Sequence, residues 1–241
     1  MSRRFEAVLF DFSATLFDDS GVLTVSGMRA AADKRGVDLD QDSAARLIET
    51  MLATVDSPAG LAAREGADRS ARLHRTVWTE LMASADTGFL PDVPPETLAE
   101  AVYEHLTDPE AWQPYPDTAE TLTGLHEAGL RIAVVSNIGW DIRPAFVTLG
   151  VADLVDVFAL SYEHASVKPE PHLFRYACEE LGVAPECALF VGDDPVKDGG
   201  ATRVGMPVYL LPGQRSPRRP RGLAAVLALT GVPASSPADV R

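Results

Sequence analysis

Short apolar runs alternate with amphipathic stretches along the second half of this chain, and this alternation constrains the fold most strongly. Four such runs lie at 131–135, 157–160, 188–191 and 208–211, with helix-like segments between them, and a fifth lies at 7–10. Strands that alternate with helices in this way are typical of a parallel sheet between two helical layers. The sequence therefore predicts an α/β protein with a Rossmann-like three-layer core. In such a core the carboxyl ends of the strands lie at one edge of the sheet.

The stretch from about residue 18 to 112 follows a different pattern. Its apolar residues recur at three-to-four spacing, which predicts four helices, near 25–35, 43–55, 68–84 and 96–106. Stretches rich in proline and glycine separate these segments. We therefore expect a core of residues 1–17 and 113–241, interrupted by a helical domain at 18–112. This insert begins just after the first strand, so it should cover the edge where a ligand would bind.

The charge of the chain limits its partners. There are 21 Lys and Arg residues against 35 Asp and Glu, so the formal net charge is −14. Nucleic acids and anionic membranes attract basic surfaces, and neither is expected as a partner. The exception is a basic run between prolines, for which a solvated loop is expected: Arg215, Arg218, Arg219 and Arg221.

Cysteine content and hydropathy indicate the cellular compartment of the protein. The two cysteines, Cys178 and Cys187, have no second pair with which to build a disulfide framework. No run approaches the roughly 18 apolar residues that a membrane-spanning helix needs. We therefore expect a cytoplasmic protein, and the sequence leaves both a monomer and a homodimer open.

Polar residues follow the ends of four predicted strands, and parallel strands would bring them to one cleft. Carboxylates from separate strands repel each other unless a cation neutralises them, and hard oxygen ligands favour Mg²⁺. A serine hydroxyl, backbone N–H groups and a lysine suit phosphate oxygens. We therefore expect a Mg²⁺ site beside a phosphate site, although each residue alone would also suit a turn or a helix cap. The residues are Asp11, Ser136, Asn137, Lys168, Asp193, Asp194 and Asp198.

Four motifs in chain order resemble those of the haloacid dehalogenase superfamily. The first is FDFSATL at 10–16, where that superfamily usually has Asp-x-Asp-x-Thr-Leu. The others are VVSN at 134–137, SVKPEP at 166–171 and VGDDPVKD at 191–198. The helical insert matches the position of the superfamily's C1 cap. The resemblance covers the whole core but does not identify a substrate.

The resemblance implies a Mg²⁺-dependent hydrolase, most simply a phosphatase acting on a small phosphorylated metabolite. Asp11 would attack phosphorus and become an aspartyl-phosphate, and Lys168 would balance its charge. The catalytic positions would then be Asp11, Ser13 and Lys168. Metal binding would involve Asp11, the backbone carbonyl of Ser13, Asp193, Asp194 and Asp198. Phosphate binding would involve Phe12, Thr15, Ser136, Asn137 and Lys168.

One position departs from the superfamily pattern. Phosphatases of the superfamily have Asp two residues after the nucleophile, where it protonates the leaving alcohol, but this chain has Ser13. A serine hydroxyl is too weak an acid for this task, and loss of a general acid typically costs about 10²–10⁴ in rate. Three hypotheses follow: a phosphatase with another proton source or a leaving group that needs no proton, a catalytically weak phospho-ligand or protein-binding module, or phosphonatase-type or dehalogenase-type chemistry.

The inserted helices should set substrate specificity, because they cover the cleft. Arg72, Arg75 and Trp78 recur at three-residue steps on one predicted helix, and Asp18 lies in the hinge after the first strand. These four could contact a substrate, although a solvated helix face and a polar linker are the alternatives. His164, near the third motif, is a candidate for the missing proton donor.

Overall fold

A computed structural model of the chain describes residues 4–213 and 218–232. Its main sheet has five parallel strands in the order β5-β4-β1-β6-β7, which confirms the expected α/β core. The central strand β1 is apolar and fully buried, as a strand covered on both faces must be. The strands are β1 (Ala7–Phe10), β4 (Arg131–Ser136), β5 (Val157–Leu160), β6 (Ala188–Gly192) and β7 (Val208–Leu210).

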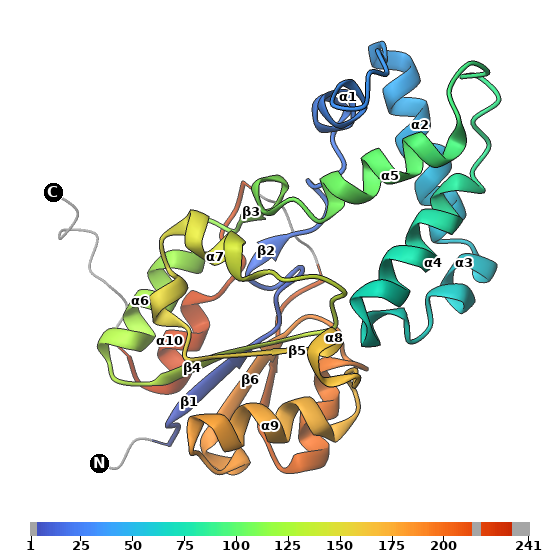
Figure 1. The fold of residues 1–241 in the computed structure, drawn as a ribbon. Helices are drawn as coiled ribbons and strands as arrows, with labels where there is room; N and C mark the ends of the chain where they lie inside the picture. Colours follow the sequence, from blue (N-terminus) through green and yellow to red (C-terminus); the bar gives the residue numbers. More distant parts are fainter. Residues whose placement is uncertain (1–3, 214–217, 233–241) are drawn as a thin grey trace, which may run out of the picture.

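Helices cover both faces of this sheet (Figure 1). Successive side chains of a strand point to opposite faces, so Val8 and Phe10 join one hydrophobic cluster while Ala7 and Leu9 join another. The first cluster is closed by α6 (Thr118–Glu127), α7 (Arg143–Leu149) and α10 (Ala224–Thr230). The second is closed by α9 (Pro171–Leu181) and the 3₁₀ helix η5 (Asp198–Val204). Short connecting elements are η2 (Pro109–Ala111), η3 (Ala152–Leu154), α8 (Ser161–His164) and η4 (Pro185–Cys187).

The inserted helices pack around a hydrophobic cluster of their own, which includes Met28, Leu47 and Val102. We call this helical unit, residues 25–106, the cap; it stands over one end of the sheet (Figure 1). Its elements are α1 (Val25–Asp33), α2 (Gln41–Val55), α3 (Pro58–Arg64), η1 (Ala67–Arg69), α4 (Ala71–Ala83) and α5 (Pro95–Leu106).

The cap has five α-helices within 25–106, all of which the structure describes, rather than the four expected. The additional helix, α3, begins in a Ser-Pro-Ala-Gly stretch that resembles a break between helices. Ser57 caps it by accepting a hydrogen bond from the Gly60 N–H, and Pro58 occupies the first turn. Gly60 is needed because a Cβ there would lie 2.4 Å from the Thr54 carbonyl oxygen.

A two-stranded antiparallel ribbon lies where the chain passes from the core to the cap and back. It pairs β2 (Phe17–Asp18) with β3 (Gln113–Pro114). The Asp18 side chain is buried there and accepts hydrogen bonds from the Ser20 hydroxyl, the Gly21 N–H and the Tyr115 hydroxyl. Asp18 therefore stabilises the turn that follows β2.

The expectation of a solvated basic loop is wrong at Arg221, which is 4% exposed. Its Nε donates to the Ala14 carbonyl oxygen at 2.7 Å, and a terminal nitrogen donates to the Pro212 carbonyl oxygen at 2.6 Å. Asp117 accepts the Arg221 N–H and fixes the start of α10. Arg218 and Arg219 are exposed, and Arg215 lies outside the described residues. None of the helices in the described ranges combines the length and hydropathy that crossing a membrane requires.

Candidate active site

Two carboxylates and one lysine meet at the carboxyl end of β1. The Lys168 Nζ lies 2.8 Å from Asp11 Oδ1 and 2.7 Å from Asp198 Oδ1. Burial raises the pKa of Asp11 from 3.8 to about 6, although Lys168 opposes this rise. Burial opposes the charged form of Lys168, but Asp11 and Asp198 outweigh it and raise the lysine pKa. Lys168 therefore carries a positive charge directly against the predicted nucleophile.

A third carboxylate completes an acidic cluster. Asp11, Asp193 and Asp198 each place one carboxylate oxygen within 4.8 Å of the others. The buried Asp198 also accepts the N–H groups of Asp193 and Asp194, both at 2.9 Å, which fixes the loop after β6. A Cβ at position 192 would lie 2.2 Å from Asp198 Oδ2, so the close approach requires Gly192.

Asp194 differs from the other predicted metal residues. Its Oδ1 accepts the N–H groups of Val196 and Lys197, and the Lys197 Nζ lies 3.5 Å from its Oδ2. These contacts hold Asp194 at the start of a turn, and they lower its pKa against the opposing effect of burial. Asp194 lines the pocket but lies outside the cluster of three carboxylates.

The predicted phosphate-binding residues divide into two groups. Ser136 and Asn137 line the pocket at the end of β4. The Asn137 side chain donates to the Lys168 carbonyl oxygen and accepts the Lys168 N–H, so it holds the lysine loop in place. Phe12 and Thr15 are buried and do not line the pocket, and Phe12 packs its ring in the core. The side chains of Phe12 and Thr15 are therefore not placed to contact a ligand in this pocket.

The loop after Asp11 is constrained by distant residues. Ser13 lines the pocket, and the next residue, Ala14, has a φ of 58°, a conformation that costs a non-glycine residue about 1–3 kcal/mol. The Ala14 N–H donates to the Phe17 carbonyl oxygen, and its own carbonyl accepts from Arg221. Arg221 is a site-supporting residue that the sequence pattern did not identify.

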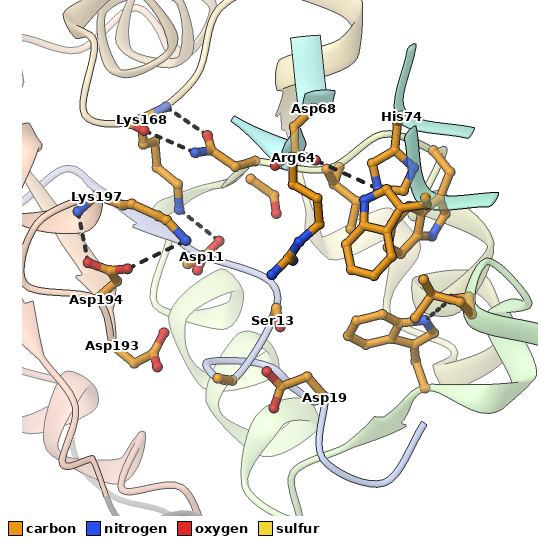
Figure 2. A pocket seen from close by; sticks show the side chains of 18 residues that line it. Asp11, Ser13, Asp19, Arg64, Asp68, His74, Lys168, Asp193, Asp194 and Lys197 are labelled. Atoms are coloured by element: carbon orange, nitrogen blue, oxygen red, sulfur yellow. Dashed lines mark hydrogen bonds and ion pairs between the residues drawn. The ribbon is translucent and has the colours of Figure 1, made fainter. Parts of the chain in front are cut away.

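The pocket above this site has a volume of about 410 Å³ and extends into the cap (Figure 2). The cap lines it with Arg64, Asp68, His74, Trp78 and Leu106. The core and the connecting segments add Asp19, Trp112 and Trp140. Figure 2 shows the Arg64 side chain pointing from the cap into the pocket.

Of the four specificity candidates, only Trp78 lines the pocket. Arg72 is exposed, and Arg75 pairs with Glu100 within the cap. Asp18 is buried in the hinge, where its neighbour Asp19 lines the pocket instead. The structure thus brings Arg64, His74 and Asp19 to the positions that Arg72, Arg75 and Asp18 were expected to occupy.

His164 does not line the pocket. Its ring packs 4.1 Å from the ring of Tyr176, and the adjacent Glu163 pairs with Arg143. This placement does not support His164 as the missing proton donor.

The cap side of the pocket contains a buried histidine that is neutral at pH 7, because burial lowers the pKa of His74 to about 4. Its Nδ1 is 2.9 Å from the Tyr103 hydroxyl, and its Nε2 is 3.7 Å from Asp68 Oδ1. Burial also raises the pKa of Asp68. Cap and core touch at this point, since the Ser161 hydroxyl donates to the Asp68 carbonyl oxygen and Arg69 pairs with Glu170.

A buried carboxylate with a raised pKa, a buried lysine and an acidic cluster at the strand ends of a parallel sheet are features typical of enzyme active sites. A family model of haloacid dehalogenase-like hydrolases matches residues 5–204. The chain belongs to this family of hydrolases.

Relatives with assigned names include phosphatases. The chain is 28% identical over 212 residues to a glyceraldehyde 3-phosphate phosphatase of Methanothermobacter thermautotrophicus, covering 86% of this chain and 85% of the relative. It is 33% identical over 117 residues to haloacid dehalogenase-like hydrolase domain-containing protein 3 of Mus musculus, covering 48% of this chain. That match, like several others, spans about half of the relative's length.

Solved structures show the same fold. An HAD phosphatase from Thermococcus onnurineus has a TM-score of 0.61 at 24% identity, covering 96% of this chain and all of the other. A dehalogenase has a TM-score of 0.62 at 20% identity, covering 98% of this chain and all of the other. At these identities the likeness establishes the fold, which phosphatases and dehalogenases share.

Proposed function

We propose that the protein is a Mg²⁺-dependent phosphatase that acts on a small phosphorylated metabolite through an aspartyl-phosphate at Asp11. The observation that carries the proposal is the position of Lys168 between Asp11 and Asp198, with Asp193 close by. A phosphoryl group needs an oxygen nucleophile on one side and cationic groups around its equatorial oxygens. The described residues supply both at the same edge of the sheet.

The donor set fits Mg²⁺. Three carboxylates within 4.8 Å carry more negative charge than Lys168 offsets, and their ligand atoms are hard oxygens. Asp11, Asp193 and the Ser13 carbonyl would hold the metal directly. The oxygens of Asp198 already accept hydrogen bonds from Lys168 and backbone N–H groups. Asp198 would therefore orient a water molecule near the metal rather than bind the metal directly. When bound, Mg²⁺ supplies Lewis-acid stabilisation of phosphoryl charge.

The reaction then proceeds in two displacements. A carboxylate oxygen of Asp11 forms a bond to phosphorus, and the bond from phosphorus to the leaving oxygen breaks with its electron pair. Lys168, Ser136 and the N–H groups after Asp11 bind the phosphoryl oxygens throughout. Water attacks the aspartyl-phosphate, which releases phosphate and restores the Asp11 carboxylate. Asn137 keeps Lys168 in position during both steps.

Ser13 supports a second candidate, a phospho-ligand or protein-binding module with little turnover. The metal and phosphate contacts do not need a carboxylate at position 13, so binding would survive its loss. The phosphonatase alternative requires a cap lysine in the pocket. Lys34 does not meet this requirement, because its side chain is 72% exposed and its partner Asp108 does not line the pocket.

The test measures phosphate release from 4-nitrophenyl phosphate and acetyl phosphate with Mg²⁺ or with EDTA. Asp11→Asn should abolish release, whereas Asp153→Asn, at an exposed position on the core, should leave it unchanged. Activity that persists in Asp11→Asn, or that ignores EDTA, would refute the proposal. Retained Mg²⁺ and phosphate binding without hydrolysis of either compound would favour the binding module.

A further inference from the structure

Neighbouring aromatic rings run from the loop after Asp11 to the cap, and the part of this wall that lines the pocket begins at Trp112. The ring of Phe12, next to Asp11, lies 4.9 Å from Trp112, and Trp112 lies 5.8 Å from Trp140. His74 follows at 5.3 Å from Trp140 and 5.3 Å from Trp78. Four of these five side chains line the pocket, and His74 is neutral at pH 7. Aromatic side chains of this kind can pack against a flat ring by offset or edge-to-face contacts.

Two hydrogen-bond donors beside this wall lack partners within the described residues. Trp78 Nε1 and Arg64 Nε are buried and make no hydrogen bond within the described residues. The Arg64 guanidinium lies over the Trp78 ring, with its central carbon 4.7 Å from the ring centroid, and one terminal nitrogen contacts Asp56 at 3.2 Å. Both atoms are donors only and have almost no accessible surface, so only an acceptor oxygen or nitrogen could satisfy them, and a ligand would reach them only after the Arg64 or Trp78 side chain moves.

The chemistry at Ser13 restricts the leaving group independently. An alkyl alcohol is about as weak an acid as water, so an alkoxide rarely leaves without receiving a proton. A phenol has a pKa of about 10, as tyrosine does, so a phenoxide leaves far more readily. Ser13 cannot supply the proton, so an alkyl leaving group would need another acid of the pocket, such as Asp68, whereas an aryl leaving group would need none. Ser13 and the aromatic wall favour the same kind of substrate.

We propose that the physiological leaving group is a flat aryl or comparably acidic ring hydroxyl that departs unprotonated, with an acceptor atom that Arg64 and Trp78 bind. The inference rests on the proposed function and names its substrate class. The Asp11 oxygen forms the bond to phosphorus, and the aryl oxygen leaves with the electron pair of the broken bond. The aryloxide takes its proton from water after it leaves the pocket. Hydrolysis of the aspartyl-phosphate is then common to all substrates, so kcat/KM reports the leaving-group step.

The first experiment compares three probes at pH 7.5 with saturating Mg²⁺. Phenyl phosphate offers a ring and an acidic hydroxyl, acetyl phosphate an acidic leaving group without a ring, and glycerol phosphate neither. We expect phenyl phosphate to exceed glycerol phosphate in kcat/KM by at least about 10²-fold, the lower range for a missing general acid. Ser13→Asp should raise glycerol phosphate turnover by a comparable factor.

The second experiment separates ring binding from leaving-group acidity. Trp78→Leu and Arg64→Gln should each raise KM for 4-nitrophenyl phosphate about tenfold or more, with little change in kcat. KM for acetyl phosphate should stay the same, because it does not reach the wall. Arg72→Gln, which alters an exposed arginine of α4, is the matched control. Trp78→Phe keeps an aromatic ring and should lose only part of the affinity. This graded effect would show that the KM increase in Trp78→Leu comes from the lost ring and not from a folding defect.

The outcomes distinguish this inference from the proposed function. Glycerol phosphate hydrolysed within tenfold of phenyl phosphate, with both rates abolished in Asp11→Asn, would overturn the substrate class and leave the phosphatase intact. Equal KM increases for acetyl and 4-nitrophenyl phosphate in Trp78→Leu and Arg64→Gln would also overturn it. Hydrolysis that persists in Asp11→Asn would overturn the proposed function itself.

Discussion

The substitution Asp11→Asn should abolish catalysis and at the same time stabilise the metal-free protein at neutral pH. Burial raises the pKa of Asp11 from 3.8 to about 6, so folding penalises the ionised carboxylate. An asparagine has nearly the same shape without the charge, and its amide oxygen can still accept a hydrogen bond from Lys168. The residue most important for the proposed reaction is therefore a source of instability in the empty site.

The size of the effect follows from the pKa. Above pH 6 the carboxyl is ionised in both the folded and the unfolded chain, and the full penalty applies. A rise from 3.8 to about 6 corresponds to about 3 kcal/mol, because each pKa unit is worth about 1.4 kcal/mol. Between pH 6 and 3.8 the folded chain keeps a proton that the unfolded chain releases, so the penalty shrinks as the pH falls. At pH 5 about half of it should remain.

The assay is urea-induced unfolding in EDTA, followed by circular dichroism, at pH 7.5 and pH 5.0. Asp11→Asn should exceed the wild type in free energy of unfolding by about 3 kcal/mol at pH 7.5 and about half of that at pH 5.0. Mg²⁺ at a hundred times its Kd should return about 2.7 kcal/mol to the wild type. The exposed Asp153→Asn variant should show no such gain. A variant less stable than the wild type at pH 7.5, or a gain that does not vary with pH, would refute the reasoning.

Three further predictions concern the groups around Asp11. Lys168→Met should lower the free energy of unfolding in EDTA by about 3–5 kcal/mol, because two buried carboxylates lose their cation. Urea titration with and without Mg²⁺ should show that the metal recovers part of this loss. Gly192→Ala should weaken Mg²⁺ binding at least tenfold by calorimetry, because its Cβ would displace Asp198, and unchanged affinity would contradict that contact. Arg221→Met should lower kcat more than it raises KM, because the Ala14 carbonyl, in the loop after Asp11, loses a hydrogen bond. Arg221→Lys should recover part of the rate.

The core and the centre of the site could be predicted from the sequence because parallel strands end at one edge of the sheet. Asp11 and Asp193 directly follow β1 and β6, whereas Lys168 lies beyond the short helix α8 and Asp198 begins η5, so the topology brings all four to the same edge of the sheet. Spacing along the chain did not show that Asp194 would be held by the N–H groups of the turn that follows it.

The cap face of the pocket could not be predicted in the same way. Helical periodicity shows which residues share a face, but tertiary packing decides which face meets the core. On α4, Trp78 and His74 face the pocket, while Arg72 and Arg75 face away from it. Arg64 was missed because the Ser-Pro start of α3 resembles a break, although it also fits a capped helix whose first turn contains proline.

The contact between Arg221 and Ala14 joins positions 207 residues apart. During synthesis Asp11 and the loop that follows it are made early, but the guanidinium that supports this loop is added only after all five strands of the main sheet and the whole cap. In a nascent chain shorter than 221 residues, the loop after Asp11 therefore lacks the hydrogen bond from Arg221. The loop therefore gains this support only once the segment that precedes α10 has reached the core.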